Sequence, residues 1–153
     1  MNKTIIGVIG GSAGDEKVRK TAYEVGRLIA EAGALLICGG LSGVMEAACK
    51  GAREAGGTTI GILKGQSIDD ANPYVDIPVA TGLGHGRNLV IINTAHALIA
   101  VSGRYGTLSE IAFAIQSGKP VFGLGTWEIE GVVKCATPEE AVNKALEAGQ
   151  SPR

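Results

Sequence analysis

The sequence predicts a single α/β domain spanning residues 1–153, built on an open, doubly wound parallel sheet with helices on both faces. Three observations predict this fold. Short runs of consecutive apolar residues, typical of strands buried on both faces, alternate with helical patterns along the chain. Glycine clusters end three of these runs. The length of 153 residues suits one domain whose core needs neither a disulfide nor a metal.

The N-terminal third predicts two strands with a helix between them. Residues 4–9 are consecutive and mostly β-branched, and glycines end the run within a few residues. This predicts a buried strand rather than a signal peptide. From Asp15, apolar residues recur on one helical face until Gly33 closes the helix. Residues 34–38 form the second apolar run and predict the second strand.

The middle of the chain continues the alternation. Small residues at 43–55 predict a helix, and the apolar run 58–63 predicts a third strand. Residues 64–73 are polar and are expected to form a loop. The run 75–80 contains Pro78. Because proline cannot donate to the hydrogen-bond ladder, this run predicts a short strand or a strand at the sheet edge.

The C-terminal half predicts further strands and helices in turn. Strands are expected at 97–101, at 121–124 and, after a loop, at 132–135. Helices are expected at 86–94, from just after Thr107 to Gly118, and at 138–148. Proline suits the first turn of the last helix because its missing N–H would be unpaired there. His96, at a helix–strand junction, is expected to be structural.

The composition limits the kind of partner. The net charge is −1, so no basic surface argues for nucleic acid. No run approaches the roughly 18 apolar residues of a membrane helix. The three cysteines lack a CxxC pair and are expected to be buried thiols in a reducing cytoplasm, with no metal site. Charged residues make up 19% and mean hydropathy is +0.22, which favours a homo-oligomer, a dimer or tetramer.

The glycine clusters point to the kind of ligand. Gly10-Gly11, Gly39-Gly40 and the segment 103–107 each follow a strand. The carboxyl ends of parallel strands share one edge, where ligands bind and helix N-termini attract anions. Glycine lets the backbone approach a ligand closely. We therefore expect a phosphate-bearing small molecule here, with Thr107 as a hydroxyl donor and Arg104 as a clamp. Tight turns alone are the alternative explanation.

Particular motifs resemble a known family. Gly103-x-x-Gly106-Thr107-x-x-Glu110 resembles the P-G-G-x-G-T-x-x-E motif of the Lonely Guy family, Rossmann-like phosphoribohydrolases that free a base from a nucleoside 5′-monophosphate. His85-Gly86-Arg87 is similar to the M-H-x-R motif of that family, and the segment 39–45 resembles a shortened G-G-G-x-x-G-L-M.

A sister group is more similar in detail. The stretches "GVIGGS", "TGLGHGRNLVIINTAHALIAVSGRYGTLSEIAFAI" and "GKPVFGLGTW" resemble a family of small Rossmann-like proteins that includes the molybdenum cofactor carrier proteins. This resemblance implies an oligomeric protein that binds the cofactor through its phosphate and pterin.

Three positions depart from the hydrolase pattern. Ser102 and Arg104 replace the Pro and the second Gly of P-G-G, and Glu46 replaces the Gly that follows L-M. Arg87 and Glu110 are kept. A cation at a helix start opposes the helix dipole, so Arg87 suggests an anionic partner.

Glu110 allows two interpretations. We expect it in the first turn of its helix, where a carboxylate complements the dipole. The resemblance places it beside the ribose instead, where it would stabilise an oxocarbenium-like centre.

These observations favour a binding protein for a phosphorylated heteroaromatic ligand, either a purine nucleotide or the molybdenum cofactor, which requires no further cofactor. The alternative is a nucleoside 5′-monophosphate phosphoribohydrolase with Arg87 and Glu110 as catalytic residues. A third possibility is an oligomer whose pocket is vestigial. The expected ligand-binding residues are Gly11, Ser12, Gly39, Gly40, Gly43, Arg87, Ser102, Gly103, Arg104, Tyr105, Gly106, Thr107 and Glu110.

Overall fold

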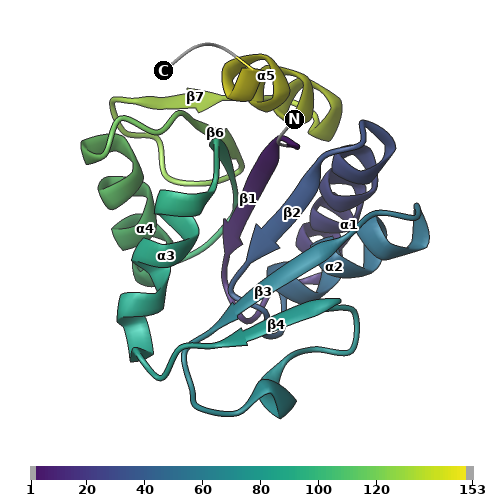
Figure 1. The fold of residues 1–153 in the computed structure, drawn as a ribbon. Helices are drawn as coiled ribbons and strands as arrows, with labels where there is room; N and C mark the ends of the chain where they lie inside the picture. Colours follow the sequence, from purple (N-terminus) through teal and green to yellow (C-terminus); the bar gives the residue numbers. More distant parts are fainter. Residues whose placement is uncertain (1–2, 151–153) are drawn as a thin grey trace.

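The computed structural model describes residues 3–150, which contain one seven-stranded parallel sheet (Figure 1). The strand order is β4-β3-β2-β1-β5-β6-β7, and every neighbouring pair is parallel. The strands are β1 (Ile5–Gly10), β2 (Leu35–Cys38), β3 (Thr59–Leu63), β4 (Ile77–Ala80), β5 (Ala97–Val101), β6 (Val121–Leu124) and β7 (Val132–Lys134). The predicted doubly wound fold class is therefore confirmed.

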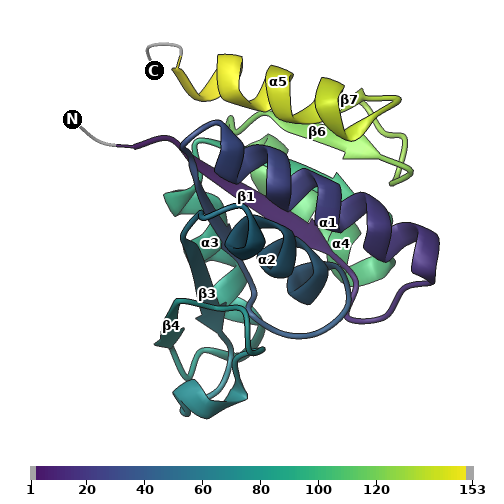
Figure 2. The ribbon, with the colours of Figure 1, turned by 90° about the vertical axis from the view of Figure 1, so that its right-hand side faces the viewer.

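Five helices cover the two faces of the sheet (Figures 1 and 2). They are α1 (Glu16–Glu31), α2 (Val44–Glu54), α3 (Arg87–Thr94), α4 (Tyr105–Gln116) and α5 (Pro138–Gln150). Helices α1, α2 and α5 pack on one face, and α3 and α4 pack on the other. Each face contributes its own cluster of buried apolar side chains. Every helix among the described residues is too short or too polar to cross a lipid bilayer.

Most expected elements appear close to their predicted bounds. Strand β4 carries Pro78 and lies at one edge of the sheet, as predicted. The loop expected at 64–73 contains a short 3₁₀ turn, Ile68–Asp70. His96 is structural, because its Nδ1 accepts a hydrogen bond from the Ile5 amide at 2.9 Å. The three cysteines are buried and form no disulfide.

The start of α4 differs from the prediction. The helix begins at Tyr105 rather than after Thr107, and the amide of Leu108 closes its first turn on the carbonyl of Arg104 at 3.0 Å. Gly106 and Thr107 are thus helical, and the expectation of Glu110 in the first turn is wrong because it lies in the second. Glycine is typical of loops, but it costs a helix little in the first turn, where the amides have no intrahelical partner.

Helices α1 and α2 approach each other with no side chain between their backbones. A Cβ atom on Gly26 would lie 1.9 Å from the carbonyl oxygen of Ala48, and one on Gly51 would lie 2.0 Å from that of Tyr23. Both distances are far below van der Waals contact. Glycine is therefore required at both positions for the helices to pack as they do.

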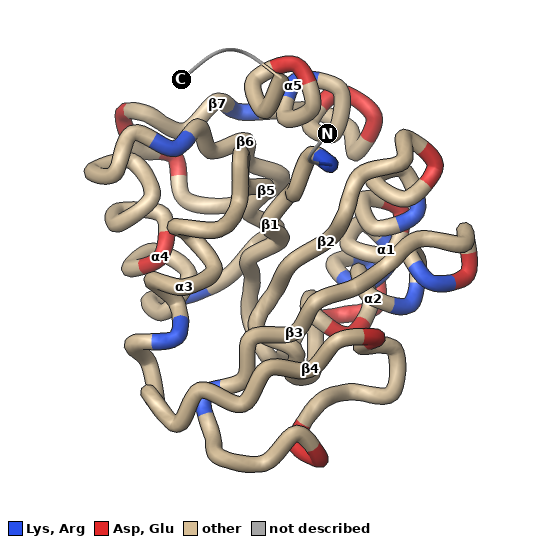
Figure 3. Tube along the Cα trace, viewed as in Figure 1, with Lys and Arg blue, Asp and Glu red and all other residues tan. Residues whose placement is uncertain are grey.

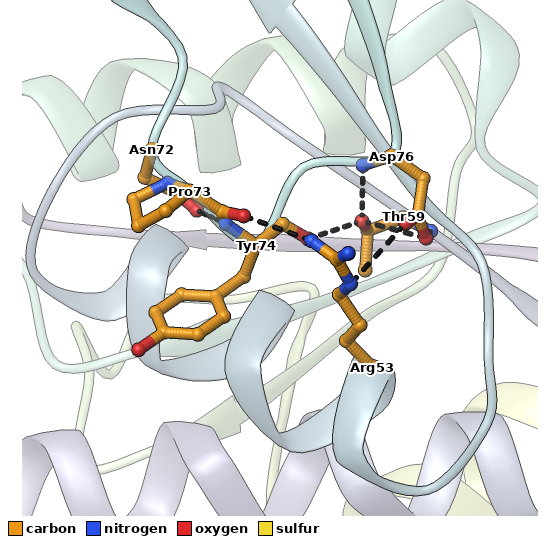
Figure 4. Close-up of polar contacts among 6 residues, drawn as sticks. All are labelled: Arg53, Thr59, Asn72, Pro73, Tyr74 and Asp76. Atoms are coloured by element: carbon orange, nitrogen blue, oxygen red, sulfur yellow. Dashed lines mark hydrogen bonds and ion pairs between the residues drawn. The ribbon is translucent and has the colours of Figure 1, made fainter.

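A polar network fixes the segment between β3 and β4 (Figure 4). Thr59 is fully buried, and its hydroxyl donates to the carbonyl of Tyr74 at 2.6 Å and accepts from the amide of Asp76 at 2.8 Å. Arg53 from α2 donates to the carbonyl of Pro73 at 2.9 Å and lies 3.5 Å from the Asp76 carboxylate.

Asn72 links this network to the glycine cluster after β2. Its amide donates to the carbonyl of Gly40 at 2.9 Å, and its side-chain Nδ2 donates to the carbonyl of Leu41 at 2.8 Å. Its Oδ1 accepts from the amide of Tyr74 at 2.9 Å. One buried side chain therefore satisfies backbone groups of two loops that are far apart in the sequence.

We expect Asn72→Ala to lower the free energy of unfolding by about 1–3 kcal/mol, because it leaves buried backbone groups without partners. Urea denaturation measures this change. Asn93→Ala is the matched control, since its side chain is exposed on α3 and should change stability by less than about 0.5 kcal/mol. Equal effects of the two substitutions would contradict the role assigned to Asn72.

Candidate functional site

A pocket of about 580 Å³ opens at the carboxyl edge of the sheet, where the chain reverses its direction of winding. Strand β1 pairs with β2 on one side and with β5 on the other. The helices that follow β1 and β5 lie on opposite faces, so their loops separate and leave a crevice. The loops at 10–14 and 102–107 line this glycine-edge pocket, and its volume suits a small-molecule ligand.

The structure brings together nine of the thirteen expected residues around this pocket. They are Gly11, Ser12, Arg87, Ser102, Gly103, Arg104, Gly106, Thr107 and Glu110. Three helices, α2, α3 and α4, start at this edge, and none of them has a side-chain cap. Helix α1 differs, because Asp15 caps it by accepting from the amide of Val18. The first amides of α2 and α3 are already bonded to backbone, Val44 to the carbonyl of Gly11 and Arg87 to that of Gly84. Helix N-termini with free amides and a positive partial charge attract anions, so α4 is the best placed of the three.

Arg87, the first residue of α3, is half-buried and held from several sides. Its Nε donates to the Asn88 side chain at 2.6 Å, and its Nη1 donates to the carbonyls of Ile62 at 3.1 Å and Gly39 at 3.3 Å. Its Nη2 makes no hydrogen bond to any of residues 3–150. Burial lowers the pKa of Arg87, but an arginine keeps its charge in proteins.

Glu110 is a partly buried carboxyl group without a hydrogen bond or ion pair among residues 3–150. Burial raises its pKa to about 7, and the positive charge of Arg87 offsets only part of this effect. The carboxyl group therefore titrates near neutral pH. Such a group can donate or accept a proton or a hydrogen bond toward a ligand in the pocket.

The loop between β5 and α4 has an unusual backbone. Ser102 has a φ of +52° and Gly103 a φ of +99°. Among residues 3–150, Ser102 is the only non-glycine residue with a positive φ, a conformation that costs about 1–3 kcal/mol. A Cβ on Gly103 would lie 2.2 Å from Oγ1 of Thr107, so only glycine fits above that hydroxyl.

Two side chains after β6 hold this loop in place. The hydroxyl of Thr126 donates to the carbonyl of Ser102 at 2.6 Å. The indole Nε1 of Trp127 donates to the carbonyl of Arg104 at 2.9 Å. These bonds fix the carbonyls on both sides of Gly103 and so support the strained conformation of Ser102. Neither residue is among those expected at the site, although both belong to the stretch "GKPVFGLGTW" that carries the family resemblance.

Four expected residues do not line the glycine-edge pocket. Gly39 and Gly40 are buried, and Gly39 makes room for the arginine, because a Cβ there would lie 2.6 Å from Nη2 of Arg87. Gly43 lets two loops meet, since its Cβ would lie 2.5 Å from the carbonyl oxygen of Gly11. Tyr105 is 75% exposed and packs against Trp127, with ring centroids 5.8 Å apart.

The pocket also contains side chains outside the expected set. Lys64, His85 and Asn88 supply polar groups, and Leu41 and Met45 supply apolar surface. Asn88 follows Arg87 directly and orients its guanidinium. Its place next to the arginine in the sequence is the signal from which a role at the site could have been predicted. Glu46, which replaces a glycine of the hydrolase motif, does not line this pocket.

The fold is a Rossmann-like α/β fold with a pocket at the carboxyl edge of its sheet. The family model described as "SLOG cluster4 family" matches residues 3–151, and the chain belongs to that family. A protein from Archaeoglobus fulgidus is 50% identical over 142 residues, which cover 92% of this chain and 93% of that protein.

Solved structures confirm the resemblance to the molybdenum cofactor carriers. The molybdenum cofactor binding protein of Rippkaea orientalis is 36% identical with a TM-score of 0.91, over 96% of this chain and 98% of that one. The Moco carrier protein of Chlamydomonas reinhardtii is 38% identical with a TM-score of 0.86, over 96% and 98% of the two chains. Identity and fold thus agree over nearly the full length.

The raised pKa of Glu110 predicts a pH-dependent stability. Its folded pKa of about 7 exceeds the ordinary value of 4.5, so the stabilisation is complete below pH 4.5 and is lost as the pH rises through 7. Glu110→Gln removes this titration. The variant should gain up to about 3 kcal/mol relative to wild type between pH 4.5 and 8, at about 1.4 kcal/mol per pKa unit. Urea denaturation across this range measures the difference, and a difference independent of pH would contradict the burial of the charge.

Proposed function

We propose that this protein binds a phosphorylated heteroaromatic ligand in the glycine-edge pocket, with residues 1–153 acting as one binding domain. The molybdenum cofactor is the first candidate, because two similar structures are described as binding or carrying it. A purine nucleotide is the second. The observation that carries the proposal is the guanidinium of Arg87, which is anchored through Nε and Nη1 in the lining of the same pocket as the N-terminus of α4, a helix without a side-chain cap.

In this proposal the phosphate binds at the N-terminus of α4. Helix N-termini bind phosphate through free amides, and the amides near Gly103 and Gly106 lie at the pocket wall. Thr107 is nearly buried, and its hydroxyl makes no hydrogen bond with the rest of residues 3–150, so it is available as a donor. Arg87 and Arg104 add positive charge. The heterocyclic ring then contacts Leu41 and Met45.

The backbone at Ser102 supports a binder over the hydrolase. The hydrolase motif has proline at this position, and the proline ring fixes φ near −65°. Ser102 has a φ of +52°, which proline cannot adopt. The loop therefore follows a path that differs from the one a P-G-G sequence allows. Arg104, which replaces the second glycine, also places a long side chain where that motif has none.

A phosphoribohydrolase is the second candidate, and one observation favours it. Glu110 lines the same pocket as Arg87, and its pKa of about 7 suits a group that exchanges protons at neutral pH. In this mechanism Arg87 holds the phosphate while Glu110 stabilises positive charge at the ribose centre or orients water.

Binding and turnover can be separated with AMP and GMP. Arg87→Ala should weaken the binding of either nucleotide by about ten- to hundred-fold, because it removes a charge-assisted contact. Glu110→Gln should change affinity only modestly. Calorimetry measures affinity, and chromatography of free base measures turnover. Lys3→Ala is the control, since this exposed lysine lies outside the glycine-edge pocket.

Two outcomes would overturn these assignments. Base release by wild type that disappears in Glu110→Gln, with affinity retained, would replace the binder with the hydrolase. Affinity that is unchanged in Arg87→Ala would contradict the anion site itself.

We also propose a homo-oligomer in the cytoplasm that binds no nucleic acid. Large apolar side chains are exposed on the face that carries α3 and α4, including Leu89 at 42% and Phe113 at 45%. Exposed apolar patches commonly mark protein interfaces. The buried free cysteines support a location in the reducing cytoplasm. The net charge of −1 supports the proposal that the protein binds no nucleic acid.

Light scattering over a concentration series should show a dimer or tetramer. Phe113→Lys should shift the protein toward monomer, because it buries a charge in the interface. Ile68→Lys is the control, because Ile68 is also exposed but lies on the 3₁₀ turn, away from α3 and α4. This variant should keep the oligomeric state of the wild type. A wild-type monomer at every concentration would contradict the oligomer.

A further inference from the structure

A second hollow lies beside the glycine-edge pocket, between α1, α2 and the segment at 72–76. It encloses about 560 Å³, close to the 580 Å³ of its neighbour. Ser12 lines both, so the two hollows share a rim. We call this second space the α1–α2 hollow. Nothing in the proposed function uses it, although charged residues are dense along these two helices (Figure 3).

Three cations open onto the α1–α2 hollow without an ion pair. They are Arg19 and Lys20 on α1 and Lys50 on α2, and none forms a hydrogen bond or an ion pair with any of residues 3–150. On the same helices, Arg27 bridges to two glutamates of α1, and Arg53 lies beside Asp76. Lys17 of α1 also has no ion pair among residues 3–150, and it lies outside the hollow. Three of the four cations of α1 and α2 that lack an ion pair therefore line the hollow, where they suit phosphate oxygens.

Carboxylates and aromatic rings complete the lining. Glu16 and Glu46 face the hollow, also without ion pairs among the described residues. Carboxylates accept hydrogen bonds from ribose hydroxyls. The rings of Tyr23 and Tyr74 supply flat apolar surface, and Lys50 lies 5.9 Å from the centre of the Tyr74 ring. Cations for phosphate, carboxylates for ribose and rings for a base match the three parts of a nucleotide.

The backbone at Tyr74 is held before any ligand arrives. Its amide donates to Asn72, and its carbonyl accepts from the buried hydroxyl of Thr59 (Figure 4). The carbonyl of Pro73 and the carboxylate of Asp76, on either side of it, both contact Arg53. In Figure 4 the ring points away from this network. A backbone segment fixed in this way loses little conformational entropy on binding.

Only backbone separates the two hollows. The hydroxyl of Ser42 donates to the carbonyl of Ser12 at 2.9 Å, and the amide of Val44 donates to the carbonyl of Gly11 at 3.1 Å. Gly43 stands at this contact, and a Cβ there would lie 2.5 Å from the Gly11 carbonyl oxygen. No bulky side chain therefore rises between the hollows at this point.

We propose that the α1–α2 hollow is a second subsite, which binds the nucleotide part of a ligand whose first phosphate-bearing part occupies the glycine-edge pocket. The protein then selects ligands of the dinucleotide class, two ring systems joined through a diphosphate, over monophosphates. This inference rests on the proposed function, since the glycine-edge pocket must hold the first part. The cations of α1 and α2 that lack an ion pair contact the diphosphate, on the side attached to the second ribose.

The test compares AMP with diadenosine diphosphate, two adenosines joined through a diphosphate, by calorimetry. Wild type should bind the dinucleotide at least about ten-fold more tightly, the size of one charge-assisted contact. The double variant Lys20→Ala/Lys50→Ala should lose most of this difference and bind AMP as wild type does. Lys3→Ala/Lys17→Ala makes the same change of charge outside the α1–α2 hollow and should keep the difference.

The outcomes separate the subsite from the proposed function. AMP binding that depends on Arg87, with no gain for the dinucleotide, would overturn the subsite alone. An equal loss of dinucleotide affinity in both double variants would also overturn it, because the effect would then be one of net charge. Dinucleotide binding that depends on Lys20 and Lys50 but not on Arg87 would support the subsite and contradict the glycine-edge assignment. Absence of binding by either nucleotide would overturn the subsite.

Discussion

The glycine edge depends on how one guanidinium group is held. Arg87 reaches from the start of α3 to the carboxyl ends of β2 and β3, where the carbonyls of Gly39 and Ile62 accept its hydrogen bonds. The space it occupies exists only because Gly39 has no side chain. The three elements therefore fix the charge in one place, and an anion that binds there need not order a flexible arginine first.

Much of this arrangement could be predicted from the sequence, because the strands carry a local signal. The apolar runs and the glycines after them placed the strands and their common edge, and Pro78 indicated the edge strand. The role of Gly39 could not be predicted, since it depends on a side chain 48 residues away. The same holds for Asn72, Thr126 and Trp127, whose contacts join distant segments.

The wrong start of α4 has a local cause. Gly106 was assigned to the loop because glycine is usually found in turns, yet the first turn of a helix tolerates it. The consequence reaches the site, since Glu110 moves to the second turn, away from the helix end. Its carboxylate thus gains little from the dipole, whose effect falls off within the first turn, and burial dominates its pKa.

The two outer strands also limit how this chain can meet other copies of itself. A free sheet edge offers unpaired amides and carbonyls on which a second chain can extend the ladder, the usual route to aggregation. Here β7 has three residues, and β4 has four, one of which is Pro78 and has no amide hydrogen. Both edges are therefore poor templates for strand addition, and orderly association is left to the helical faces.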